Sequence, residues 1–178
     1  MVIRKLLAAL PALFTLHANA ALNIGDTAPD FTAQATLAGK EFTYSLRDAL
    51  KSGPVVLYFY PAAFTPGCTV EAHDFAEAVD RYKALGASVI GVSHDSIDTL
   101  KRFSVSECRS KFAVVADTDR SIMKAYDAVM FLMPNHASRT SYVIASTGKI
   151  VYVYSSMRPD KHVANTLAAV RSWTAEHH

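Results

Sequence analysis

The cysteine at position 68 has the sequence setting of a reactive residue. It follows a continuous apolar run at residues 55–60, which has the length and the β-branched and aromatic content of a strand buried on both faces. Pro61 ends this run, the segment AAFTPG forms a short turn, and a helical pattern of apolar residues extends from Thr69 to Gly86. Cys68 is therefore expected in the first turn of a helix.

That position favours nucleophilic chemistry, because free N–H groups and the positive end of the helix dipole stabilise a thiolate. We expect them to lower the pKa of Cys68 well below the usual value of about 8.5. Pro66 restricts Thr65 to an extended conformation, so the Thr65 hydroxyl is held at one angle near the sulfur. Gly67 allows a small molecule to approach the backbone closely. These residues together predict a thiolate site for a small substrate.

The same residues resemble a known family. Pro61, Thr65 and Cys68 match the PxxxTxxC pattern of the peroxiredoxins, and the segments TPGCTVEA, GVSHDS (91–96) and RTSYVI (139–144) resemble the Q-type subfamily, also called bacterioferritin-comigratory proteins. The resemblance spans roughly residues 22–172. It implies a thioredoxin-like α/β fold and a thiol-dependent peroxidase that reduces hydrogen peroxide and organic hydroperoxides.

The resemblance also implies a set of catalytic residues, which are Cys68, Thr65, Pro61 and Arg139. Cys68 would be the peroxidatic cysteine, which peroxide converts to a sulfenic acid. Thr65 would hydrogen-bond the sulfur and the peroxide oxygen, and Arg139 would supply a second positive charge beside the thiolate. The alternatives are a buried structural cysteine at 68 and a surface arginine at 139.

An apolar collar is expected around the entrance to this site. Pro61 and Pro66, with Phe64, would form it and admit hydroperoxides. The alternative is ordinary packing of the same residues within a turn.

One position departs from the family pattern. Many Q-type members carry a resolving cysteine five residues after the peroxidatic one, where this chain has His73. Cys108 is then the candidate resolving cysteine, on a predicted helix at 97–108. Two alternatives remain for Cys108: a thiol packed as a small hydrophobe, or a permanent structural disulfide with Cys68. An electrostatic influence of His73 on Cys68 is a further hypothesis.

The first twenty residues predict a secretory signal peptide. Arg4 and Lys5 precede a mostly apolar stretch at 6–16, and the Ala-Asn-Ala sequence at 18–20 is typical of a cleavage site. The alternative is an uncleaved anchor, although the stretch is shorter than the roughly 20 residues that a membrane span needs. We expect an exported protein, in the bacterial periplasm, with residues 21–178 forming a single domain.

Composition limits the partners. Loss of residues 1–20 would remove two of the 18 basic residues and leave them equal in number to the 16 acidic ones, so no basic patch predicts nucleic-acid binding. We expect no stable membrane association after cleavage, a monomer or weak dimer, and a thioredoxin-like or small-thiol reductant. The resemblance implies no metal, haem or flavin cofactor. The histidines lack ligand spacing and are expected to face solvent or lie in loops.

The patterns along the chain predict a mixed sheet covered by helices, with an N-terminal β-hairpin extension. The expected elements, in order, are a hairpin at 31–37 and 42–44, a helical turn at 46–51, the strand at 55–60, the helix that follows Cys68, a strand at 87–92, the helix at 97–108, a strand at 112–115, a helix containing 122–126, a loop at 130–136, a hairpin at 141–145 and 150–154, and a last amphipathic helix around 163–170.

Two other functions fit the same fold. A thiol–disulfide oxidoreductase is one, but it normally uses a C-x-x-C pair that this sequence lacks. The other is a peroxide-sensing module that passes its oxidation to a partner without turnover. Turnover of peroxide with a dithiol would separate these functions from a peroxidase.

Overall fold

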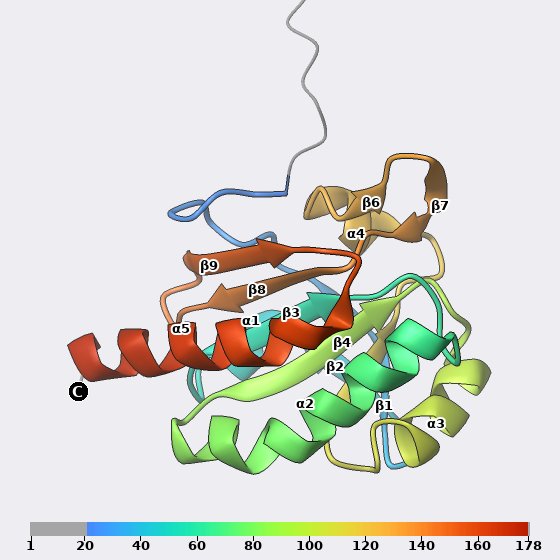
Figure 1. Ribbon diagram of the computed structural model, residues 1–178, viewed down its shortest axis with the longest axis horizontal. Helices are drawn as coiled ribbons and strands as arrows, with labels where there is room; N and C mark the ends of the chain where they lie inside the picture. The colour runs from blue at the N-terminus through green and yellow to red at the C-terminus, as the bar shows by residue number, and fades with distance from the viewer. Residues whose placement is uncertain (1–20, 178) are drawn as a thin grey trace, which may run out of the picture.

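A sheet of seven strands forms the centre of the computed structural model, which describes residues 21–177 (Figure 1). The strand order is β2-β1-β5-β4-β3-β8-β9. Their bounds are β1 Thr32–Leu37, β2 Lys40–Ser45, β3 Val55–Phe59, β4 Ser88–Ser93, β5 Ala113–Ala116, β8 Thr140–Ile144 and β9 Ile150–Ser155. β3 pairs in parallel with β4 and antiparallel with β8. The prediction of a mixed sheet with an N-terminal hairpin, β1–β2, is confirmed.

Helices cover both faces of this sheet, which explains why every residue of β3 is buried. The helices are α1 Leu46–Leu50, α2 Pro66–Ala84, α3 Ile97–Ser106, α4 Ser121–Ala125 and α5 His162–His177, with a 3₁₀ turn η1 at Pro159–Lys161. Val56 and Tyr58 face a core shared with α2, α3 and α5, whereas Val55, Leu57 and Phe59 face one shared with α1 and α4. Because side chains alternate between the two faces of β3, this strand contributes to the apolar core on each side of the sheet.

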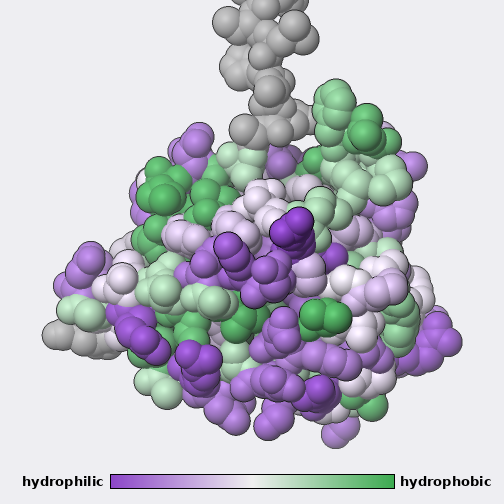
Figure 2. Space-filling model, in the orientation of Figure 1, coloured by the Kyte–Doolittle hydropathy of each residue, from purple (hydrophilic) through white to green (hydrophobic). Residues whose placement is uncertain are grey.

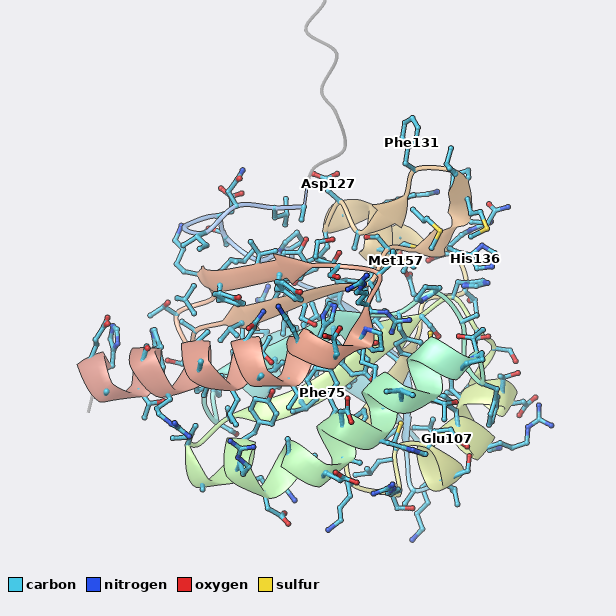
Figure 3. All side chains as sticks on the ribbon, in the orientation of Figure 1. Phe75, Glu107, Asp127, Phe131, His136 and Met157 are labelled. Atoms are coloured by element: carbon cyan, nitrogen blue, oxygen red, sulfur yellow. The ribbon has the colours of Figure 1, made fainter. Side chains whose placement is uncertain are left out.

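α2 and α5 lie side by side on one face of the sheet (Figure 1). Phe75, Val79 and Tyr82 are buried along α2, as their helical spacing predicts, and Phe75 lies between this helix and the sheet (Figure 3). α2 ends before Gly86, which has a φ of 72°. No helix among residues 21–177 is long and apolar enough to span a bilayer, and the predicted signal peptide lies outside the described residues.

The prediction of a loop at 130–136 is wrong. Val129–Met130 (β6) and Met133–Ala137 (β7) form a two-stranded antiparallel ribbon that projects from the rest of the fold (Figure 1). Pro134 does not prevent this, because each strand of a lone ribbon has an open edge that needs no N–H donor. Phe131 at the tip is 88% exposed and points away from the fold (Figure 3). Apolar side chains colour this projection green in Figure 2.

The helix expected at 97–108 is also shorter than predicted. α3 ends at Ser106, and the N–H of Cys108 donates back to the carbonyl of Phe103, at 3.0 Å. Arg109 and Ser110 then adopt positive φ angles of 49° and 58°, which take the chain away from the helix axis. Cys108 therefore lies in a turn between α3 and β5, and not on the helix.

We expect α4 to depend on a buried cap. Asp117 is 2% exposed, and its two carboxylate oxygens accept from the N–H groups of Ile122 and Met123 at 3.0 and 2.8 Å. Asp117→Ala should lower the free energy of unfolding by about 2 kcal/mol, since it leaves two buried donors unpaired. Urea unfolding would measure the loss. Asp119→Ala, which removes only an exposed cap to Ser121, is the matched control, and equal losses would contradict the prediction.

Candidate active site

Cys68 lies in the first turn of α2 and is almost completely buried. Thr65 precedes the helix with φ −76° and ψ 148°, the extended conformation that the following proline favours. The first intrahelical bond near the sulfur runs from the N–H of Thr69 to the carbonyl of Thr65, at 2.9 Å. The N–H groups of Gly67 and Cys68 precede this bond, so both belong to the donors that a helix cannot satisfy itself. The local backbone thus concentrates partial positive charge at the sulfur.

The Thr65 hydroxyl does not point its hydrogen at the sulfur. It donates to the carbonyl of Ala62, at 3.0 Å, and makes no capping bond to the helix. The oxygen of Thr65 still has free lone pairs, so it can accept a hydrogen bond but has no hydrogen left to donate. Pro61, which ends the buried strand segment, is partly buried at the start of the same loop.

A partly buried contact from the segment after β4 fixes this loop. Asp95 follows β4, and its Oδ2 accepts from the N–H of Ala63 and from the hydroxyl of Ser93, both at 2.8 Å. The GVSHDS segment was only a family marker at the level of sequence, where Asp95 had no predicted role. The structure shows that this segment ties the loop before Cys68 to the end of β4, in the middle of the sheet.

Arg139 lies immediately before β8 and is buried, with 3% of its surface exposed. Its Nη2 donates to the sulfur of Cys68 at 3.4 Å, its Nη1 donates to Glu71, and its Nε donates to the carbonyl of Met157 at 3.2 Å. Arg139 is therefore not a surface residue. Three contacts hold its guanidinium in one orientation beside the sulfur.

Gly67 makes room for this guanidinium. A Cβ atom at position 67 would lie 3.0 Å from Nη2 of Arg139, closer than nearly all side-chain contacts. The φ of Gly67 is not in the left-handed region, so the backbone itself does not require glycine. A side chain here would instead force the Arg139 guanidinium to move by a few tenths of an ångström.

Glu71 and His162 complete the site, and neither was found from the sequence. Glu71 is one helical turn beyond Cys68 and is fully buried against Arg139. Burial raises the pKa of Glu71 to about 8, although Arg139 acts in the opposite direction. Burial alone would lower the pKa of Arg139, but the charges of Glu71 and Cys68 outweigh it and raise that pKa.

The expectation that the histidines face solvent or lie in loops is wrong for His162. This residue begins α5, is completely buried, and has its Nδ1 atom 3.6 Å from Oε1 of Glu71. The i, i+3 spacing of Cys68 and Glu71 on one helix face was the available signal for Glu71. The sequence holds no such signal for His162, because this residue is distant in sequence from Cys68 and Glu71. It meets Glu71 only through the tertiary fold.

Cys108 is the second buried cysteine, and both cysteines are free thiols. They belong to one apolar cluster that also contains Tyr58 and Tyr60. Burial, and then the charge of Glu107, raises the pKa of Cys108. The Cys108 thiol is therefore neutral and shielded in this conformation.

The turn that carries Cys108 is fastened to α2 from outside. His73 Nε2 lies 3.0 Å from Oε2 of Glu107, and Nη1 of Arg109 lies 3.0 Å from Oε1 of Glu77. Figure 3 shows Glu107 at the end of α3 next to α2. His73 occupies the position that departs from the Q-type pattern, and its partner is the residue adjacent to Cys108. Ion pairs near the surface contribute little to stability, so these two contacts add little to the backbone hydrogen bonds of this turn.

No group of three or more His, Cys, Asp or Glu side chains within residues 21–177 could hold a metal ion. The rings of His94 and His136 do meet edge to face, with centroids 4.7 Å apart. That pair lies outside the set formed by Cys68, Arg139, Glu71 and His162. What the described site offers chemically is a thiol among preorganised hydrogen-bond donors.

A mixed α/β fold in which a buried cysteine opens a helix and faces an arginine defines a thiol site of the thioredoxin-like class. The chain belongs to the AhpC/TSA family, whose profile matches residues 24–153. Its relatives include chloroplastic peroxiredoxin Q of Triticum aestivum, 34% identical over 83% of this chain and 66% of that protein, and chloroplastic peroxiredoxin Q of Sedum lineare, 33% identical over 83% of this chain and 77% of that protein. The chain thus spans slightly less than two thirds of the wheat protein.

Solved structures agree with this assignment. Peroxidoxin BcpB of Mycobacterium tuberculosis matches with a TM-score of 0.76 and 31% identity, over 84% of this chain and 96% of that one. A point mutant of PrxQ from Xylella fastidiosa matches with a TM-score of 0.76 and 26% identity, over 86% of this chain and 98% of that one. The bacterioferritin comigratory protein of Xanthomonas campestris is described as having alkyl peroxide reduction activity. It matches with a TM-score of 0.71 and 27% identity, over 79% of this chain and 91% of that one. The family resemblance and the thioredoxin-like fold are confirmed.

We expect Gly67→Ala to weaken the contact between Arg139 and Cys68, because the added methyl group occupies the space of the guanidinium. The rate of Cys68 alkylation by iodoacetamide at pH 7 should fall roughly tenfold while the fold is kept. Mass spectrometry of the alkylated chain would give the rate. Val70→Ala, at an exposed position in the same helix, is the control. An unchanged rate for Gly67→Ala would show that the sulfur does not depend on this contact.

Proposed function

We propose that this protein is a thiol peroxidase that reduces hydrogen peroxide and organic hydroperoxides at the expense of an external dithiol. The observation that carries the proposal is the 3.4 Å contact between Arg139 Nη2 and the sulfur of Cys68, at the N-terminus of α2. Membership of the AhpC/TSA family and the peroxiredoxin Q relatives support it.

In the first step the Cys68 thiolate attacks one oxygen of the hydroperoxide. An S–O bond forms, the O–O bond breaks, and the leaving oxygen departs with the bonding electron pair and takes up a proton as water or an alcohol. Cys68 is oxidised to a sulfenic acid. The N–H groups of Gly67 and Cys68 and the Arg139 guanidinium are donors for the charge that develops on oxygen.

Thr65 and Pro61 have supporting roles in this proposal. The Thr65 hydroxyl has given its hydrogen to Ala62, so it acts as the acceptor for the O–H group of the hydroperoxide. Pro61 follows β3 and, with Asp95, holds the loop that positions this hydroxyl. The substrate is then oriented by one acceptor and several donors around the thiolate.

An open hollow next to the loop fits the organic part of a hydroperoxide. It has a volume of about 710 Å³ and is lined by Phe64, Lys101, Arg102, Val105 and Ser106. Phe64 and Val105 are about half exposed, and Phe64 packs edge-on against Phe103 with centroids 5.3 Å apart. An alkyl group would bury these apolar surfaces.

Cys108 is proposed as the resolving cysteine. Its thiolate would attack the sulfur of the Cys68 sulfenic acid, forming a disulfide and releasing the sulfenic oxygen as water. The buried thiol needs a local opening of the turn after α3 for this step. The positive φ angles of Arg109 and Ser110 favour such an opening. Each non-glycine residue in this left-handed backbone conformation costs the folded turn roughly 1 kcal/mol or more.

The remaining parts of the proposal concern the cellular setting. The reductant is a thioredoxin-like protein or a small thiol, which reduces the Cys68–Cys108 disulfide. Residues 1–20 act as an export signal, residues 21–178 form one domain, and the compartment is the bacterial periplasm. The protein acts as a monomer or weak dimer. A peroxide sensor without turnover is the alternative function.

Steady-state peroxide consumption with dithiothreitol tests the peroxidase. We expect many peroxide molecules to be reduced per chain, no turnover for Cys68→Ser, and a loss of at least about a hundredfold in the second-order rate constant for Arg139→Ala, because one donor and the neighbouring charge are removed together. Arg171→Ala, at an exposed position of α5, is the matched arginine control. A single oxidation per chain would contradict the peroxidase and support the sensor.

Mass spectrometry after one equivalent of peroxide tests the resolving role. The wild type should lose the mass of two hydrogen atoms by forming one intramolecular disulfide, whereas Cys108→Ser should stop at the sulfenic or sulfinic acid. Arg109→Ala should form the disulfide faster, because it releases the turn from Glu77. A wild type that stops at the sulfenic acid would leave Cys108 as a packed core residue.

A further inference from the structure

The guanidinium of Arg139 is shared between two acidic groups. Nη2 contacts the sulfur of Cys68 at 3.4 Å, and Nη1 contacts Oε2 of Glu71. Both contacts are buried, where charges interact more strongly than in water. The protonation state of Glu71 therefore decides whether the arginine charge acts on the sulfur alone or is shared between the sulfur and the Glu71 carboxylate.

The second carboxyl oxygen of Glu71 has no hydrogen-bond partner. Oε1 is fully buried and lies 3.6 Å from Nδ1 of His162, and no polar atom of the described chain bonds it. A buried carboxylate oxygen without a donor is costly, whereas a protonated one needs an acceptor. Nδ1 of His162 is the ring nitrogen that faces this oxygen, at a distance longer than a hydrogen bond, so its lone pair acts on the carboxyl group electrostatically.

The surroundings of His162 define its tautomer. Nε2 lies 2.9 Å from the carbonyl of Ser156, and a carbonyl only accepts, so Nε2 carries the ring hydrogen. Nδ1 lies 2.8 Å from the hydroxyl of Ser141, which can donate to it. In a neutral ring Nδ1 has one lone pair, which accepts from the Ser141 hydroxyl, and Oε1 of Glu71 faces the same nitrogen from 3.6 Å. Burial lowers the pKa of His162 and so favours the neutral ring.

We propose that one proton on the buried carboxyl group of Glu71, which faces Nδ1 of His162, controls how strongly Arg139 acts on Cys68, so that Glu71 and His162 are positioning residues of the site. The inference rests on the proposed peroxidase function. With the proton in place, the Glu71–His162 pair is neutral and Arg139 gives its full charge to the sulfur and to the peroxide. Once the proton leaves, the carboxylate competes for the same guanidinium.

Other charged groups around the pair act in known directions. Asp74 on α2 disfavours a second negative charge at Glu71, and Asp160 in η1 favours a positive charge on His162, whereas Arg139 opposes one. Tyr58 on β3 also faces the Glu71 charge, and burial keeps this phenol neutral. The Glu71 pKa of about 8, raised by burial, places loss of the proton just above neutral pH.

The test is the pH dependence, from about pH 6 to 9.5, of the rate of Cys68 oxidation by hydrogen peroxide in single-turnover experiments. The wild-type rate should fall roughly tenfold above about pH 8, because Glu71 deprotonates and draws Arg139 away from the reacting atoms. Glu71→Gln cannot deprotonate and should show no fall. His136→Gln, which changes a histidine that contacts His94 outside the site, should keep the wild-type profile.

Two His162 variants separate the roles of the ring nitrogens. His162→Gln keeps a donor for the carbonyl of Ser156 but removes the Nδ1 lone pair that faces Glu71, so the fall in rate should move to lower pH, since that lone pair disfavours the carboxylate. His162→Asn places an oxygen near the position of Nδ1 and should keep the fall near its wild-type pH. Circular dichroism and urea unfolding would show that each variant is folded.

Several results would overturn the proposal. A fall at alkaline pH that persists in Glu71→Gln would show that Glu71 does not cause it, and this comparison decides the matter if a His162 variant does not fold. A folded His162→Gln with the wild-type profile would remove His162 from the control. A chain whose Cys68 is alkylated by iodoacetamide but is oxidised by peroxide at no pH would instead overturn the proposed peroxidase.

Discussion

The architecture of the site depends on the contact between Arg139 and Cys68. The two residues are far apart in sequence and meet because the start of β8 pairs with the end of β3, from which the loop to α2 departs. Two further hydrogen bonds direct the guanidinium, and Gly67 leaves the space for it. A positive charge buried this far from water is stable only with such partners. The sulfur and Glu71 are those partners, so the reactive group also stabilises the arginine that activates it.

Local sequence patterns were sufficient for most elements of the fold. β3 was predicted from an uninterrupted apolar run, α2 from the spacing of its buried residues, and the β8–β9 hairpin from its turn residues. Pro134 suggested a loop, although an isolated ribbon tolerates proline. The apolar spacing also continued to Cys108, although α3 ends at Ser106. Periodicity alone does not show where a helix ends when no glycine or proline marks the end.

The site was less accessible to sequence reasoning than the fold. Cys68 had a local signal, but Arg139 was related to it only through a resemblance. Glu71 looked like one of several acidic residues on α2, and its i, i+3 spacing from Cys68 was a weak signal beside the burial that distinguishes it from exposed Glu77. His162 was expected to face solvent or lie in a loop, because the histidines lack metal-ligand spacing. Its burial results from the packing of α5 over β8, a tertiary contact that no local pattern encodes.

The projecting ribbon β6–β7 has a consequence for the molecule in solution. Phe131 and Leu132, both more than four fifths exposed, stand at its tip with nothing of the described chain over them. The exposure of these side chains to water is unfavourable in proportion to their apolar surface area. The two strands beneath them, β6 and β7, pair only with each other. Heat or mild denaturant should therefore loosen this ribbon before the central sheet, and the chain would become prone to self-association through its apolar tip while the thiol pocket is still intact.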